Sequence, residues 1–325
     1  MAVTDTLPAN VRRRWSTIHL RELLAGEGML YLAFLILILG FSLSSPFFLT
    51  LRNFENIGRQ TALVSIMSVG MAFVIIAGEF DLSVGSVLAL SGVVAAFAMQ
   101  QLESLWIFGM VAGLAMGAAF GLINGVLTTR FRIPSFLITL GSLGIARGLA
   151  MMITNTRPVL ITSPAFFNIF GEGQLLGIPV VIVWTAVVAV AGIVLLHFGT
   201  FGRRVYASGG NVTAARYSGI NTDRVKITTL ILSGFLAGLA ALVLIARSHA
   251  ARPDVGAGME LDVITAVILG GAALTGGRGT IVGALVGSLI IGILNNGLVL
   301  LGVDSSLQIA IKGLIIWVSV IMSRK

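Results

Sequence analysis

The sequence predicts an all-α polytopic membrane protein, with about ten transmembrane helices and both termini in the cytoplasm. Of its 325 residues, 57% are apolar and only 10% are charged, whereas soluble domains carry about 25% charged residues. The apolar residues form continuous runs. Only helices or closed barrels satisfy the backbone in lipid, and barrel strands would alternate in polarity about every ten residues. The continuous runs therefore indicate helices.

Ten apolar stretches are predicted to be membrane spans, of which the eighth is short. Their approximate bounds are 29–48, 62–78, 87–100, 105–129, 134–154, 179–196, 227–245, 261–273, 281–301 and 306–322. The first is too long for a signal-peptide apolar region and no clear cleavage site follows it, so we expect an uncleaved span. Residues 28–325 then form a single transmembrane domain. The basic segment 1–27 is either an interfacial amphipathic helix or a disordered tail that only sets orientation.

The second and third spans are separated only by the sequence GEFDLSVGS, residues 78–86. Glu79 and Asp81 lie there with almost no loop, and Asp81 and Ser83 can cap the next helix. One interpretation is a tight turn or broken helix at membrane depth, buried in protein or lining a wet cavity. The alternative is a hairpin that reaches the cytoplasmic headgroups. Ionisable residues at membrane depth are functional candidates.

Small residues dominate one face of the fourth span. Its glycines recur at spacing four, which lets a neighbouring backbone approach closely: Gly113, Gly117, Gly121 and Gly125. Asn124 lies beside this stripe. In the fifth span, Arg147 either pairs within the bundle or extends to the interface, and we favour a structural role for it.

The second half contains another glycine-rich break, TGGRGT at 275–280, which predicts a turn or broken helix near residues 272–280. The stretch 267–284 weakly resembles 73–86, a hint of duplicated halves. Segment 155–178 is the longest loop expected outside, and it has room for a short surface helix. Fourteen of the 21 Lys and Arg residues fall on the side assigned to the cytoplasm, which supports the orientation.

The polar interruption at residues 198–226 contains a short helix with both ends marked. Asn211 is suited to cap its start, residues 212–218 form about two turns, and Gly219 supplies the left-handed position after its end. Asn221 can cap the next span. A helix this short is marginal in water, so we expect it to dock on a partner; the alternative is an ordinary solvated loop. Arg216 is expected to be an exposed charge.

Several chemistries are excluded or unsupported. The chain has no Cys, and its three His are scattered, so no metal site, catalytic set or cofactor site is predicted. None of the three Lys lies in a G-x-x-x-x-G-K-[ST] loop, so ATP is not hydrolysed here by a P-loop. The net charge of +8 follows from membrane topology and does not indicate a nucleic-acid partner. Intramembrane carboxylates lie near span ends, which weighs against a proton- or sodium-driven carrier.

Four motifs carry a family resemblance: GEFDLSVGS at 78–86, GRRVYASGGNVTAARYSGI at 202–220, the ELD–AVILGG–GGRGTIVGALVG run at 260–287, and ILNNGLVLLGV at 293–303. Together they resemble the membrane subunit of bacterial ribose-type monosaccharide importers of the ABC class, from the first span to the C-terminus. In that family the residue at position 79 is usually apolar, so Glu79 is a departure that affects any inference about the path near this turn.

The resemblance implies an inner-membrane permease that works as a homo- or heterodimer with two cytoplasmic ATPase domains and a periplasmic sugar-binding protein. The ATP would be bound by the partner subunits. It also implies that the short helix is the element coupled to the ATPase. The coupling residues are then Gly202, Arg203, Arg204, Tyr206, Gly209, Gly210, Asn211, Ala214, Ala215, Arg216, Ser218 and Gly219.

A sugar in transit needs weak, dispersed hydrogen bonds, because a tight site would trap it. The candidates for its path are Glu79, Asp81, Asn124, Thr139, Asn295 and Asn296, although amides also join neighbouring helices. Alternatives are a branched-chain amino acid permease of the ABC class, a standalone secondary carrier, or a membrane scaffold. The docking helix favours an ABC subunit over the last two.

Overall fold

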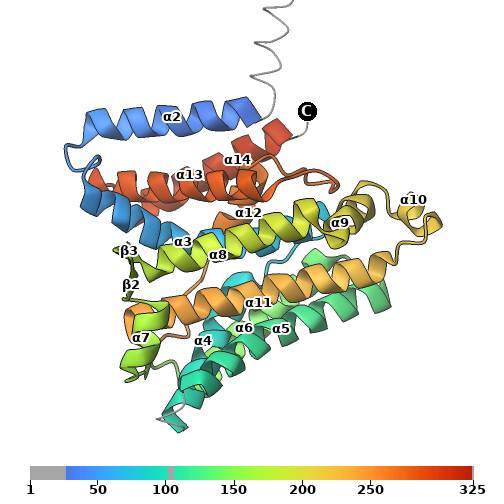
Figure 1. Cartoon of the computed structure of the whole chain (residues 1–325), viewed down its shortest axis with the longest axis horizontal. Helices are drawn as coiled ribbons and strands as arrows, with labels where there is room; N and C mark the ends of the chain where they lie inside the picture. The colour runs from blue at the N-terminus through green and yellow to red at the C-terminus, as the bar shows by residue number, and fades with distance from the viewer. Residues whose placement is uncertain (1–26, 102–105, 324–325) are drawn as a thin grey trace, which may run out of the picture.

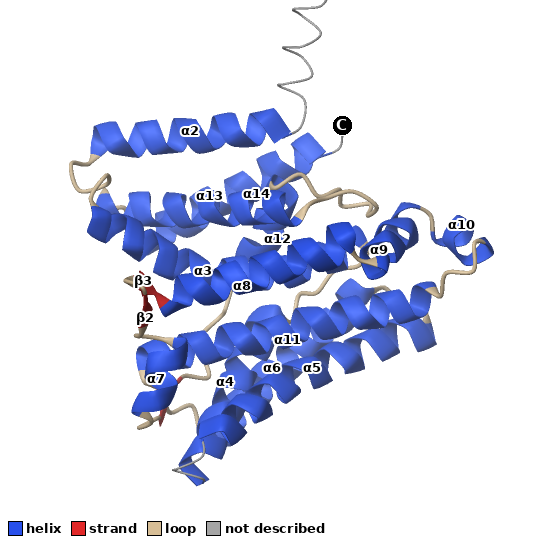
Figure 2. Cartoon of the chain, viewed as in Figure 1, coloured by secondary structure: helices blue, strands red, loops and turns tan. Residues whose placement is uncertain are grey.

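The computed structural model describes residues 27–101 and 106–323, so the predictions for segment 1–26 lie outside the described residues. Helices make up most of this part of the chain, and the long ones lie side by side along roughly one common direction (Figures 1 and 2). The apolar helices are α2 (Glu27–Ser44), α3 (Leu51–Ile76), α4 (Val84–Gln101), α5 (Trp106–Phe131), α6 (Ser135–Thr154), α8 (Val180–Ile193), α11 (Thr222–Ser248), α12 (Met259–Leu269), α13 (Ile281–Leu300) and α14 (Ser305–Ser323).

These ten helices coincide with the ten predicted spans. Six of them, α3, α5, α6, α8 with its π-helical end, α11 and α13, have the length and hydropathy of a membrane span within the described residues. The helices α3 and α11 begin before the predicted apolar cores, at Leu51 and Thr222, because polar first turns extend them beyond the hydrophobic stretch. The prediction of helical spans is thus confirmed for these six.

The short elements gather at the two ends of the bundle. At one end lie the surface helix α7 (Pro164–Phe170) and four two-residue strands, β1 (Val159–Leu160), β2 (Gln174–Leu175), β3 (Ile178–Pro179) and β4 (Ala250–Ala251). β1 pairs with β4 and β2 pairs with β3, both antiparallel. At the other end, the π-helix η2 (Val194–Phe198) leads into α9 (Thr200–Gly210) and the projecting α10 (Val212–Tyr217) (Figure 1). The short helix expected within 155–178 is therefore present as α7.

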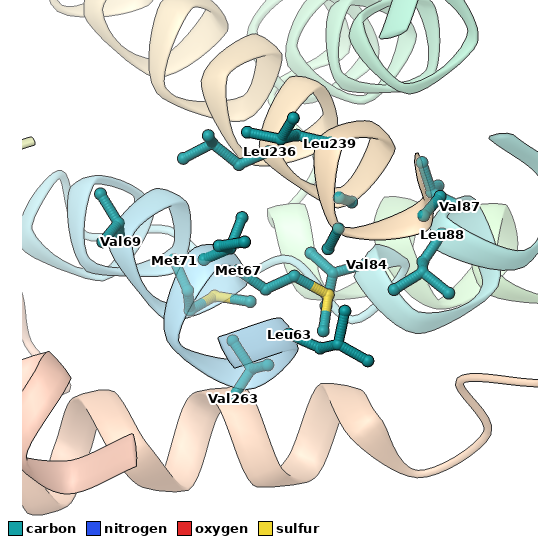
Figure 3. Close-up of a cluster of buried hydrophobic side chains, with 14 of the residues drawn as sticks. Leu63, Met67, Val69, Met71, Val84, Val87, Leu88, Leu236, Leu239 and Val263 are labelled. Atoms are coloured by element: carbon teal, nitrogen blue, oxygen red, sulfur yellow. The ribbon is translucent and has the colours of Figure 1, made fainter. Parts of the chain in front are cut away.

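The core is centred on α3 and α11. Every residue of α3 from Thr61 to Ile76 is buried, and Figure 3 shows this helix meeting α4, α11 and α12. The side chains drawn there are apolar and include Leu63, Met67, Val69, Met71, Val84, Val87, Leu88, Leu236, Leu239 and Val263. A second apolar cluster joins α2 to α3 and α13 through Phe41, Phe48 and Ile57.

The glycine stripe of α5 admits a neighbouring backbone closely, as predicted, and the structure shows that this neighbour is α11. A Cβ added to Gly117 would overlap the carbonyl oxygen of Gly234, and one added to Gly234 would overlap that of Gly117. Gly121 abuts the Leu230 carbonyl and Gly125 lies against Ile227 in the same way. The two backbones therefore touch over about two turns, and only glycine permits this approach.

Candidate functional site

The helix α10 has the two end caps that the sequence predicts. The Asn211 side chain accepts a hydrogen bond from the Ala214 N–H at 2.9 Å. At the other end, Gly219 has a φ of +81°, and Ile220 N–H donates to the Ala215 carbonyl at 3.0 Å, the pairing of a Schellman motif. The Asn221 side chain then caps α11 by accepting from Arg224 N–H at 2.9 Å. Both caps and the helix between them are confirmed.

The predicted coupling residues fall into an exposed set and an inward set. The exposed residues are Arg203, Arg204, Gly210, Asn211, Ala214, Arg216, Ser218 and Gly219. Gly202 and Ala215 are buried, while Gly209 and Tyr206 are half-buried. The sequence analysis missed Tyr217, whose side chain on α10 is 90% exposed; an apolar aromatic ring on a two-turn surface helix was the available signal. The projecting face of α10 thus offers Tyr217 and Ala214, while Ala215 faces its own chain.

Arg216 is exposed, as expected, but it does more than carry a free charge. Its Nε donates to Thr222 Oγ1 at 2.9 Å, and a terminal nitrogen donates to Asp223 Oδ1 at 2.7 Å. Arg216 therefore ties α10 to the first turn of α11. The expectation that it contributes only an exposed charge is corrected accordingly.

The helix α9 rests on a glycine junction, which we define as Gly78, Gly209, Gly210, Gly276 and Gly277. Gly277 N–H donates to the Ile76 carbonyl at 2.9 Å, and Gly209 lies so close to this pair that an added Cβ would overlap the Ile76 oxygen. The φ angles of Gly78, Gly276 and Gly277 are +82°, +83° and +74°, which favours glycine at each.

The junction brings together the two glycine-rich breaks that the sequence analysis found similar. The break near 272–280 is a loop between α12 and α13, as predicted. Tyr206 of α9 fastens this loop, because its hydroxyl donates to the Gly279 carbonyl at 2.7 Å. Burial raises the pKa of Tyr206, so the phenol stays protonated and keeps donating.

The turn at residues 78–83 is mostly buried, although Gly78 is exposed, and side chains of α5, α6 and α11 hold it. Asp81 is 1% exposed and accepts from Ser83 N–H at 3.0 Å, from Ser83 Oγ at 2.6 Å and from Ser233 Oγ of α11 at 2.8 Å. Asn124 of α5 donates to Ser83 Oγ at 3.0 Å and accepts from Ser142 of α6 at 2.5 Å. Asp81 therefore binds Ser83, the residue just before α4, and among the described residues it accepts from no N–H of that helix, so its predicted capping role is not confirmed. Asn124 joins Ser83 to α6.

Side chains of α6 also bind the backbone of the turn. Phe80 N–H donates to Ser135 Oγ at 2.9 Å, and Leu82 N–H donates to Thr139 Oγ1 at 3.1 Å. Thr139 is fully buried. Glu79, which is 7% exposed, forms an ion pair with Lys226 of α11. Asp81, Asn124, Thr139 and Glu79 therefore all have partners within the chain, and their place on a sugar path stays a prediction.

The two remaining path candidates differ in their surroundings. Asn296 and Asn53 of α3 exchange amide hydrogen bonds at 3.0 and 2.9 Å, an interhelical pair that the sequence did not predict. Asn295 is partly exposed, and its buried Oδ1 has no hydrogen-bond partner among the described residues. Of the six candidates, Asn295 is thus the one whose side chain has a buried acceptor without a partner in the described part of the chain.

Two other charges in predicted spans have structural partners. Arg147 donates to the carbonyls of Pro253 and Val255 at 2.5 and 2.6 Å, which confirms the structural role favoured for it. Lys312 of α14 pairs with Asp262 of α12 at 2.9 Å. A cavity of about 310 Å³ between α3, α5, α8 and α11 is lined by apolar residues, among them Phe73, Trp184 and Phe235. This cavity lacks the hydrogen-bonding groups that would hold a sugar.

The bundle of long apolar helices, with a capped polar element projecting at one end, is typical of a multi-spanning membrane protein. The chain belongs to the family described as branched-chain amino acid transport system / permease component, whose model matches residues 53–320. It is thus a transport component and, like its bacterial relatives, an inner-membrane protein.

Individual relatives match over almost the whole chain. The ribose import permease protein of Escherichia coli K12 is 43% identical over 297 residues, which are 90% of this chain and 92% of the relative. That of Bacillus subtilis 168 is also 43% identical, over 91% of this chain and 92% of its own. The D-allose transport system permease protein of E. coli K12 is 38% identical over 90% and 89%. No solved structure matches the chain.

Proposed function

We propose that this chain is the permease subunit of an ATP-driven importer that moves a monosaccharide, ribose or a related sugar, from the periplasm to the cytoplasm. The observation that carries this proposal is the 43% identity to ribose import permeases over about nine-tenths of both chains. The family description names branched-chain amino acids, which remains the second candidate. The named ribose, arabinose and allose relatives favour a sugar.

In this proposal the two ends of the bundle face different partners. The end with α9 and α10 lies in the cytoplasm and docks on an ATPase domain, because it gathers Arg203, Arg204 and the projecting Tyr217. The end with α7 faces the periplasm and receives the sugar-binding protein. Ten spans with both termini in the cytoplasm fit this orientation, and two permease chains with two ATPase domains would complete the complex.

The permease would alternate between outward-open and inward-open arrangements. These must differ by only a few kcal/mol for ATP binding to reverse their order. The sugar path would use dispersed hydrogen bonds, with Asn295 as its leading candidate because its Oδ1 is unused among the described residues. This chain supplies the gated path, while the binding protein supplies affinity and the partner subunits bind ATP.

The proposal is tested by reconstituting the permease with its ATPase and binding protein in vesicles. We expect ATP-dependent uptake of radiolabelled ribose, or of allose or arabinose, and no uptake of leucine. Omission of the ATPase should abolish uptake. Uptake of leucine in place of the sugars would establish the amino acid alternative, and uptake without the ATPase would establish a secondary carrier.

Gly219→Val is expected to weaken coupling without preventing membrane insertion. The positive φ of Gly219 strains Ala by roughly 1 kcal/mol and a β-branched residue by more, whereas an added Cβ would meet no atom within 4 Å. The effect therefore comes from the backbone alone, and uptake should fall severalfold. Gly219→Asn is the matched control, because Asn tolerates this conformation. Equal uptake by the Val and Asn variants would show that the cap geometry is unimportant for transport.

A further inference from the structure

A buried ion pair connects the start of α11 to the turn at residues 78–83. Lys226 Nζ contacts Glu79 Oε1, and the two side chains are only 19% and 8% exposed. Charges removed from water in this way are costly unless they remain paired. The two residues lie 147 positions apart in sequence, so their ion pair fixes the position of α11 relative to the turn at residues 78–83.

On one side, this ion pair is connected to the docking segment, by which we mean α9 and α10. Lys226 lies one helical turn after Thr222 and Asp223, the two residues that bind the Arg216 guanidinium. Arg216 belongs to α10, which projects from the end of the bundle (Figure 1). A displacement of α10 therefore pulls directly on the first turn of α11, and Lys226 lies in the turn that follows it.

On the other side, the pair continues to α6. Phe80, next to Glu79, donates its N–H to Ser135, and Leu82 donates to Thr139. Both acceptors lie in the first two turns of α6. Only six of the 20 residues of α6 are buried within this chain, and Ser135 and Thr139 are two of them. A movement of the turn therefore reaches α6 through two hydrogen bonds, in which backbone N–H groups of the turn donate to side-chain hydroxyls of α6.

We propose that Glu79 and Lys226 are positioning residues of the transport cycle, which transmit displacement of α10 through the turn at 78–83 to α6. This role rests on the proposed import function. In this role the two residues act through the turn and not by contact with sugar or ATP. They act by keeping the turn attached to α11 while the docking segment moves, so that ATP hydrolysis and sugar movement stay linked.

The test is a charge-exchange cycle, because a contiguous set of contacts shows coupling only when the partners depend on each other. Glu79→Gln, Lys226→Gln and the exchanged double variant Glu79→Lys/Lys226→Glu are reconstituted with the ATPase and binding protein. The readout is the number of sugar molecules imported per ATP hydrolysed. We expect each single variant to lower this ratio at least about fivefold and the exchange to restore at least half of it.

The pair Asp262–Lys312 provides a matched control, since it is also a partly buried carboxylate–lysine pair, at 14% and 27% exposure. It joins α12 to α14, and neither residue has a hydrogen bond or ion pair with α9 or α10 among the described residues. Asp262→Asn is expected to lower thermal stability but to leave sugar imported per ATP unchanged. An equal fall in the ratio for Asp262→Asn and Glu79→Gln would refute a specific role for Glu79.

Other outcomes are also decisive. Wild-type permease that imports no sugar refutes the proposed function, whereas wild-type import with an unchanged ratio in Glu79→Gln refutes the positioning role alone. If the neutralised variants fail to accumulate in the membrane, Ser135→Ala and Thr139→Val test the α6 side of the same connection without altering charge. A reduced ratio in these two variants supports the proposal, and a wild-type ratio overturns it.

Discussion

Gly209→Ala is expected to cause a large loss of ATP-coupled transport, whereas Gly210→Ala, one residue further on, should have little effect. A methyl group on Gly209 would overlap the Ile76 carbonyl oxygen and lie 2.7 Å from Gly277 N. These two atoms form the hydrogen bond that closes the glycine junction. Overpacking of this kind typically costs about 1–3 kcal/mol, so we expect α9 to be displaced from the end of α3.

The adjacent glycine supplies the control within the same helix. A methyl group on Gly210 would lie 3.9 Å from Gly277 Cα, an ordinary van der Waals distance. Uptake and ATP hydrolysis are measured for both variants in reconstituted vesicles. We expect Gly209→Ala to lower uptake by about tenfold, since each 1.4 kcal/mol corresponds to a factor of ten. Comparable uptake in both variants would mean that close contact at the junction is not needed for coupling.

Gly117→Ala is expected to destabilise the fold more than the same glycine-to-alanine change on α6. The added methyl group would overlap the carbonyl of Gly234 and force α5 away from α11. A cost of about 1–3 kcal/mol is typical of such overpacking, and several neighbouring contacts along the stripe would loosen with it. The midpoint of thermal unfolding in detergent should fall clearly below that of the wild type.

Gly144→Ala on α6 is the matched control, because nothing lies within 4 Å of its added Cβ. Replacement of a helical Gly by Ala there should be neutral or stabilising by up to about 1 kcal/mol. The double variant Gly117→Ala/Gly234→Ala should lose less than the sum of its single changes, because either change alone already separates the same two backbones. A Gly117→Ala protein with the wild-type midpoint would disprove close backbone packing between α5 and α11.

Local sequence patterns were sufficient for the helices and their ends. Apolar runs predicted the six confirmed membrane-length helices because hydrophobic length is fixed by the bilayer. Asn211, Gly219 and Asn221 predicted the caps of α10 and α11 because each satisfies backbone groups within a few residues of itself. The spacing of Gly117 and Gly121 predicted a packing face for the same reason: the residues that define it lie on one helix.

The helix α9 was not predicted, because its own sequence is rich in glycine and polar residues. Val205 and Ser208 are fully buried in it, and Tyr206 is held by the Gly279 carbonyl. Packing against α3, α11 and the 270–280 loop therefore stabilises a helix whose local propensity is weak.

By itself, the sequence determined where the long apolar helices lie, where α10 begins and ends, and that polar residues cluster at 78–83. Only the tertiary structure decided their partners: Lys226 for Glu79, Ser233 for Asp81 and Asn53 for Asn296. The physical reason is one of range. Caps and helical faces depend on neighbours within one or two turns, whereas these polar partners lie more than 140 positions away and meet only after the helices have packed.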